Sequence, residues 1–85
     1  MKKIGIIIPT YNEGENIENL VEKIESLLPN SEIFIIDDSK TRLPDKIFKN
    51  KNLINYFHRG QKLGRGTAVI FGLEHALKKN YIDIF

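Results

Sequence analysis

The 85-residue sequence contains no cysteine, which excludes disulfide bonds and thiolate metal sites and fits a reducing compartment. Excess charge is also small, because the net charge of +2 falls short of the basic excess typical of nucleic-acid-binding domains. Long apolar runs are missing too: runs such as Ile6–Ile8 are far below the ~20 residues that a membrane span needs. Pro9 and Glu13 come too early for the core of a signal peptide. These absences predict one small cytoplasmic domain.

The sequence does contain a regular series of strand patterns. Apolar runs typical of buried strands lie at Ile4–Ile8 and Ile33–Ile36. A third strand is predicted at Leu53–Phe57, and a fourth begins at Tyr81. Proline has no amide hydrogen to give to a strand ladder, so Pro9 predicts the end of the first run.

Helical spacing of apolar residues separates these runs. One helix is predicted after Asn12, and another from Gly66 or Thr67 to Asn80. The second helix is expected to bury one apolar side, formed by Val69, Ile70, Leu73, Ala76 and Leu77. Lys46–Asn52 is ambiguous between loop and one or two helical turns. This alternation predicts an α/β fold with a parallel sheet and right-handed crossovers.

Three polar segments follow the first three predicted strands: Tyr11–Glu13, Asp37-Asp38 and His58–Gly66. In open parallel sheets, ligands bind beyond the carboxyl ends of the strands. We therefore expect these segments, which are far apart in the sequence, to lie together at one edge of the sheet and to form a ligand site.

The residue types in these segments favour a nucleoside diphosphate as the ligand. Tyr11 can stack on a flat ring, and Asp37 or Asp38 can accept hydrogen bonds from a base edge or a ribose hydroxyl. Gly64 and Gly66 allow backbone amides to approach a phosphate near the N-terminus of a helix. Three cations stand in the same loop: Arg59, Lys62 and Arg65. The sequence matches neither the G-x-x-x-x-G-K-S/T phosphate loop nor the dinucleotide fingerprint after its first strand.

Plainer structural interpretations remain open for the same residues. Tyr11 can be a packed loop aromatic, and Asp37 and Asp38 can cap the turn that follows them. Glu13 can simply favour the positive end of the first helix, and Asn12 is expected to cap that helix rather than to contact a ligand. The three cations can form a solvated loop.

Neither histidine predicts a metal site, because His58 and His75 lack carboxylates at the spacing of metal ligands. His75 is expected on a helix surface. Gly72, within the second helix, is expected to allow close packing of that helix against the sheet.

Three segments of the chain resemble family 2 glycosyltransferases. They are IIPTYNE at Ile7–Glu13, the apolar run into Asp37-Asp38, and GRGTAVIFGLEHA at Gly64–Ala76. Within that family, the chain is most similar to dolichol-phosphate and polyprenyl-phosphate mannosyl- or glucosyltransferases. The resemblance implies a GT-A fold, with a Rossmann-like parallel sheet in the order 3-2-1-4 and helices on both faces. Residues 1–85 would be the N-terminal nucleotide-binding part of that domain.

The resemblance also implies a nucleotide-sugar site made by six residues: Pro9, Tyr11, Glu13, Ile36, Asp38 and Gly64. It places the first three beside the base, Ile36 against it, and Asp38 on the base or the ribose. The family's Mg²⁺ or Mn²⁺ is held by a D-x-D motif at the end of the fourth strand, whereas this sequence ends at Phe85. Two cations of Ser39–Arg42 stand where the family has an acid. We therefore expect no catalytic residue and no metal ligand in this chain.

By the same resemblance, the expected function is transfer of a hexose, mannose or glucose, from a GDP- or UDP-linked sugar. The acceptor would be a polyprenyl or dolichyl phosphate at the membrane surface, or a glycan, and the 85 residues alone would be inactive. One alternative is a non-catalytic remnant that binds a nucleotide or a protein. Another is a different nucleotide-binding fold, such as a flavodoxin-like one. The exposed edge of the sheet also predicts self-association.

Overall fold

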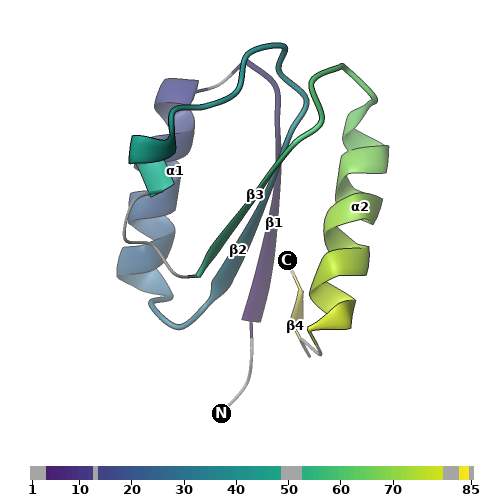
Figure 1. Cartoon of the computed structure of the whole chain (residues 1–85). Helices are drawn as coiled ribbons and strands as arrows, with labels where there is room; N and C mark the ends of the chain where they lie inside the picture. Colours follow the sequence, from purple (N-terminus) through teal and green to yellow (C-terminus); the bar gives the residue numbers. More distant parts are fainter. Residues whose placement is uncertain (1–3, 13, 49–52, 80–82, 85) are drawn as a thin grey trace.

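The computed structural model describes residues 4–12, 14–48, 53–79 and 83–84. Within them lie β1 (Ile4–Thr10), α1 (Gly14–Leu27), β2 (Glu32–Asp37), the short 3-10 helix η1 (Asp45–Phe48), β3 (Ile54–His58), α2 (Arg65–Lys78) and β4 (Asp83–Ile84). The strands form a parallel sheet in the order β3-β2-β1-β4, with α1 on one face and α2 on the other (Figure 1). The predicted α/β fold is therefore confirmed, and the strand order is the one that the resemblance implies rather than a flavodoxin-like one.

β2 lies at the centre of the core, and all six of its residues are buried. Its side chains alternate between the two faces of the sheet. The cluster on the α1 face contains Ile8, Ile17, Val21, Ile33 and Ile35. The cluster on the α2 face contains Phe34, Ile36, Ala68 and Ala76. Burial on both faces explains why this strand is a continuous apolar run rather than an alternating one.

β1 continues beyond its predicted end, through Pro9 to Thr10. The N–H of Asp38 donates to the C=O of Thr10 at 3.0 Å, so the backbone N–H and C=O of Thr10 point toward β2. Backbone N–H and C=O groups point to alternate sides from one residue of a strand to the next, so the nitrogen of Pro9 points toward the β4 side of β1. There β4 pairs with Ile4 and Gly5, so the missing N–H costs no ladder hydrogen bond within the described residues. The prediction that Pro9 ends the strand is wrong for this reason.

Other element boundaries differ slightly from those predicted. β3 extends one residue further, to His58, and α2 begins at Arg65, just before the predicted start. The ambiguous segment Lys46–Asn52 overlaps η1, which covers Asp45–Phe48, and its residues 49–52 lie outside the described residues. Differences of this size are ordinary at the ends of elements. Among the described residues, no helix has the length and apolar character needed to cross a bilayer.

The side that α2 buries agrees with the predicted one only at Ala76. The buried residues of the helix are Ala68, Gly72 and Ala76. Four larger apolar residues of the predicted side are exposed instead: Val69, Ile70, Leu73 and Leu77. The close packing expected at Gly72 is confirmed, because a Cβ there would lie 2.6 Å from Cγ2 of Ile7. This close approach of small residues to β1 turns the larger side chains away from the sheet.

His75 also differs from its predicted surface position. Its side chain is half-buried, and its ring centroid lies 4.5 Å from those of both Phe57 and Phe71. Its Nδ1 lies 2.9 Å from the C=O of Phe71. Because Phe57 belongs to β3, these ring contacts connect α2 to β3, the strand next to β2 at the end of the sheet.

Replacing Gly72 by alanine is expected to destabilise the fold by about 1–3 kcal/mol, because the new methyl group overlaps Ile7 in a packed core. Urea unfolding followed by circular dichroism measures the change. Gly66→Ala is the matched control, because a Cβ at that position of α2 meets nothing within 4 Å. The control should be neutral or stabilising, by up to about 1 kcal/mol. Equal effects of the two substitutions would contradict the close packing.

Candidate functional site

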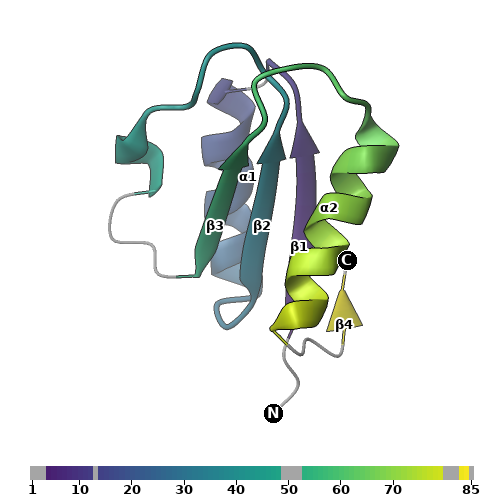
Figure 2. The same ribbon diagram turned by 45° about the vertical axis from the view of Figure 1, so that its right-hand side comes forward.

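The loops that follow β1, β2 and β3 meet at the carboxyl edge of the sheet (Figure 2). Backbone hydrogen bonds continue from the strands into these loops. The N–H of Asp38 donates to the C=O of Thr10 at 3.0 Å, and the N–H of Arg59 donates to the C=O of Asp37 at 2.8 Å. The end of β2 therefore holds the ends of both neighbouring strands, and the predicted polar segments share one edge.

Asp37 has a structural role at this edge. It is fully buried, and its Oδ1 accepts the N–H of Ser39 at 2.9 Å, which caps the turn after β2. Its Oδ2 accepts the hydroxyl of Tyr56 from β3 at 2.5 Å. That hydroxyl in turn accepts the N–H of Leu43 at 2.9 Å. Both carboxylate oxygens are thus engaged away from solvent, which agrees with the capping interpretation and not with ligand binding.

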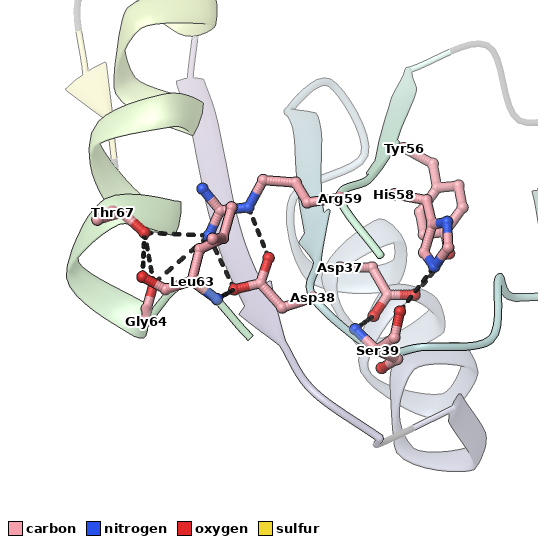
Figure 3. A network of polar contacts seen from close by, with 9 residues as sticks. All are labelled: Asp37, Asp38, Ser39, Tyr56, His58, Arg59, Leu63, Gly64 and Thr67. Atoms are coloured by element: carbon pink, nitrogen blue, oxygen red, sulfur yellow. Dashed lines mark hydrogen bonds and ion pairs between the residues drawn. The ribbon is translucent and has the colours of Figure 1, made fainter. Parts of the chain in front are cut away.

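Ser39 connects the end of β2 to the loop after β1 and to β3. Its Oγ accepts the N–H of Asn12 at 2.5 Å, and its C=O lies 2.7 Å from Nε2 of His58 (Figure 3). Asn12 has a φ of 55°, in the left-handed region that asparagine adopts more readily than most residues. The hydrogen bond from Asn12 to Ser39 therefore stabilises a sharp turn of the chain immediately after Tyr11.

Asp38 forms an ion pair instead of a second cap. Arg59 donates to it through two nitrogens, Nε to Oδ1 at 2.5 Å and a terminal nitrogen to Oδ2 at 2.8 Å (Figure 3). Oδ2 also accepts the N–H of Leu63 at 3.2 Å. The hydrogen bond from Arg59 lowers the pKa of Asp38 below its usual 3.8, against the opposing effect of burial. Arg59 is accordingly not part of a solvated loop.

A cavity of about 230 Å³ opens between these loops and the first turn of α2. It is lined by Pro9, Thr10, Tyr11, Asp38, Lys62, Gly64, Arg65 and Ala68. Four of the six residues implied by the resemblance thus share one cavity. Ile36 does not line it, because its side chain is fully buried in the α2 cluster. Glu13 lies outside the described residues.

Tyr11 is the aromatic side chain at this cavity. It is 43% exposed, which disagrees with its interpretation as a packed loop aromatic. The Nζ of Lys62 lies 5.3 Å from the centre of its ring, within the range of a cation–π contact. Lys62 and Arg65 both line the cavity, whereas the charge of Asp38 is balanced by Arg59. The cavity therefore presents an aromatic ring and an excess of positive charge.

Three residues of the site were not predicted from the sequence: Thr10, Ser39 and Tyr56. The Thr10 hydroxyl is buried beside the cavity and has no hydrogen-bond partner in the part of the chain that the structure describes. The feature of the sequence that could have indicated Thr10 is its position between Pro9 and Tyr11. Tyr56 gave a signal too, as an aromatic side chain with a polar tip in a predicted strand. Ser39 directly follows the paired aspartates.

The described ranges contain no cluster of three or more histidine, cysteine or acidic side chains that could hold a metal ion. Both histidines are engaged otherwise, His58 with Ser39 and His75 with Phe71. The oxygens of Asp37 and Asp38 already accept hydrogen bonds from protein donors. The site thus favours an anionic, partly aromatic ligand over a bare cation.

The lowered pKa of Asp38 predicts how the stability of the chain depends on acid. Its ion pair should stabilise the fold fully above the ordinary pKa of 3.8, and this contribution should disappear as the pH falls through the lower, folded-state value. Asp38→Asn lacks this pH-dependent contribution to the free energy of unfolding. The difference in unfolding free energy between the two proteins, measured in urea from about pH 6 to about pH 2, should therefore shrink with acid. A constant difference would contradict the ion pair.

Tyr56 should be a strong determinant of stability at the same edge. Burial and the neighbouring Asp37 carboxylate raise its pKa to about 12, so the hydroxyl stays protonated and donates at neutral pH. Tyr56→Phe removes this hydroxyl and leaves Oδ2 of Asp37 and the N–H of Leu43 without this partner, while Oδ1 keeps the N–H of Ser39. We expect a loss of about 1–3 kcal/mol in urea unfolding. A loss below about 0.5 kcal/mol would show that water replaces the hydroxyl.

Comparisons with known proteins agree with the family resemblance. Residues 5–84 match the family model described as "Glycosyl transferase family 2". Polyprenol monophosphomannose synthase of Mycolicibacterium smegmatis is 31% identical over 81 residues, which cover 89% of this chain and 31% of that protein. Dolichol-phosphate mannosyltransferase of Pyrococcus furiosus is 35% identical over 82 residues, which cover 87% of this chain and 22% of that protein.

Glycosyltransferase AglD of Haloferax volcanii is 31% identical over 84 residues, which cover 87% of this chain and 14% of that protein. The chain thus spans less than a third of the length of each of these relatives. No solved structure matches it significantly.

Proposed function

The chain belongs to glycosyl transferase family 2, and from this premise we propose that residues 1–85 form the nucleoside-binding part of a glycosyltransferase domain. The enzyme would transfer a hexose, mannose or glucose, from a GDP- or UDP-linked sugar to a polyprenyl or dolichyl phosphate or to a glycan. Two similar proteins carry names that refer to mannose on such lipids. The observation that carries the proposal is that Pro9, Tyr11, Asp38 and Gly64, from three separate loops, line one cavity.

The side chains of the cavity suit the parts of a nucleoside diphosphate. The exposed ring of Tyr11 offers a face for stacking a base. Lys62 and Arg65 offer positive charge for the diphosphate. Asp38 can accept about four hydrogen bonds as a carboxylate. Arg59 and Leu63 occupy three of these positions, and Oδ1, which accepts Nε of Arg59, is the oxygen with more room for an N–H of the base or a ribose hydroxyl.

The Mg²⁺ or Mn²⁺ expected for a full-length family enzyme does not fit the described residues. Hard cations require several oxygen ligands, whereas Asp37 is buried and Asp38 is committed to Arg59. We therefore assign no catalytic step to these residues and propose that the chain alone binds nucleotide without turnover. A non-catalytic nucleotide- or protein-binding role is the second candidate, and the commitment of both aspartates to protein donors favours it. We place the site in the cytoplasm, with a lipid-phosphate acceptor reached at the membrane surface.

Titration with GDP and UDP, with and without Mg²⁺, tests the proposal through amide chemical shifts. Shifts should concentrate at Tyr11, Asp38 and Gly64. Tyr11→Ala should weaken binding by about 1–3 kcal/mol, the usual contribution of a base stacked on an aromatic ring. Tyr11→Phe keeps the ring and serves as the matched control, with affinity close to that of the unaltered chain. Shifts distributed away from the cavity, or equal losses in both variants, would contradict base stacking at Tyr11.

A further inference from the structure

The Arg59 guanidinium lies at the centre of the polar network beside the cavity, where the sequence suggested either a cation for a phosphate or a solvated one. The side chains of Arg59 and Asp38 are 12% and 7% exposed, so their ion pair is largely withdrawn from water. The guanidinium also lies 5.8 Å from the centre of the Phe71 ring of α2. A partly buried charge of this kind needs the full set of hydrogen bonds that surrounds it.

These hydrogen bonds join three elements that form the cavity wall. The terminal nitrogen that binds Asp38 also donates to the C=O of Gly64 at 3.4 Å and to Oγ1 of Thr67 at 3.2 Å (Figure 3). The Thr67 hydroxyl reaches back to the C=O of Leu63 at 2.8 Å and to that of Gly64 at 2.9 Å. Through this one side chain, the end of β2 is connected to the loop before α2 and to the first turn of that helix.

The positive charge of Arg59 also affects the net charge of the cavity. Asp38 lines the cavity, and its negative charge would oppose a diphosphate bound nearby. The Arg59 guanidinium neutralises this charge, so Lys62 and Arg65 determine the sign of the net charge in the cavity. It also directs two of its nitrogens to the carboxylate, which, together with the backbone of Leu63 and Gly64, restricts the hydrogen bonds that Asp38 can accept from a ligand.

We propose that Arg59 is a positioning and specificity-determining residue of this site, which orients Asp38 and the Gly64 backbone toward the nucleoside and makes the cavity selective for nucleotides that carry a diphosphate. The inference rests on the proposed function. Lysine cannot fully replace this side chain, because a point charge lacks the planar fork that binds both carboxylate oxygens and the loop together.

The test compares dissociation constants for GDP, UDP, guanosine and uridine in the unaltered chain, Arg59→Gln and Arg59→Lys. In Arg59→Gln, the preference for a diphosphate over its nucleoside should fall about tenfold, because one nearby positive charge is lost. Arg59→Lys should restore this preference but not the affinity for the nucleoside alone. The preference is a ratio of two constants in one protein, so a purely structural effect on the folded fraction leaves it unchanged.

Arg42→Gln is the matched control, because Arg42 also pairs with an aspartate but is 53% exposed and does not line the cavity. It should leave the preference unchanged. In the ligand-free chain, the Leu63 amide signal should shift in Arg59→Gln and not in Arg42→Gln, since that N–H binds the Asp38 carboxylate.

The outcomes separate the two proposals. Binding by the unaltered chain with an unchanged preference in Arg59→Gln would overturn the role of Arg59 and leave the proposed function intact. An equal loss in Arg42→Gln would overturn it as well, because the effect would then be one of net charge. An unaltered chain that binds neither diphosphate would overturn the proposed function and this inference together.

Discussion

The polar end of β2 is the constraint on which the rest of the site depends. This strand is buried on both faces and continues directly into Asp37, Asp38 and Ser39, which are buried as well. Buried carboxylates and backbone groups are costly unless each finds a hydrogen-bond partner. β3 and the loops after β1 and β3 supply many of those partners, and these contacts hold the loops at one edge of the sheet. The cavity thus lies where the polar groups at the end of a fully buried strand are satisfied.

Two neighbouring aspartates have opposite roles because side chains alternate along a strand. Asp37 continues the face of Ile33 and Ile35, where α1 and Tyr56 exclude water and any ligand. Asp38 continues the face of Phe34 and Ile36, where the start of α2 leaves a cavity. One carboxylate therefore stabilises the loop, while the next pairs with Arg59 and lines the cavity. The alternation of side chains between the two faces of the sheet therefore determines which aspartate faces the cavity.

Much of this arrangement could be predicted from the sequence, because the α/β alternation and the rule for parallel sheets bring Tyr11, Asp38 and Gly64 to the same edge. The partners of individual side chains could not. The pairing of Arg59 with Asp38 joins residues 21 positions apart and depends on the path of a loop without periodic pattern. The bond from Asn12 to Ser39 spans 27 positions and depends on one residue with a positive φ. Periodicity predicts elements and faces, whereas these contacts are decided by loop geometry.

The orientation of α2 was mispredicted for a reason that bears on the site itself. Hydrophobicity alone would turn Val69, Ile70, Leu73 and Leu77 toward the sheet, yet the helix buries Ala68, Gly72 and Ala76. Small residues permit a closer approach to β1 than branched ones would, and Gly72 lies against Ile7 with no room for a methyl group. That approach brings Ala68 and Arg65 to the cavity and Thr67 within reach of Arg59. The exposed apolar side chains are therefore the counterpart of a helix that packs on the sheet through small residues, a conflict between local pattern and final structure of the kind expected near functional regions.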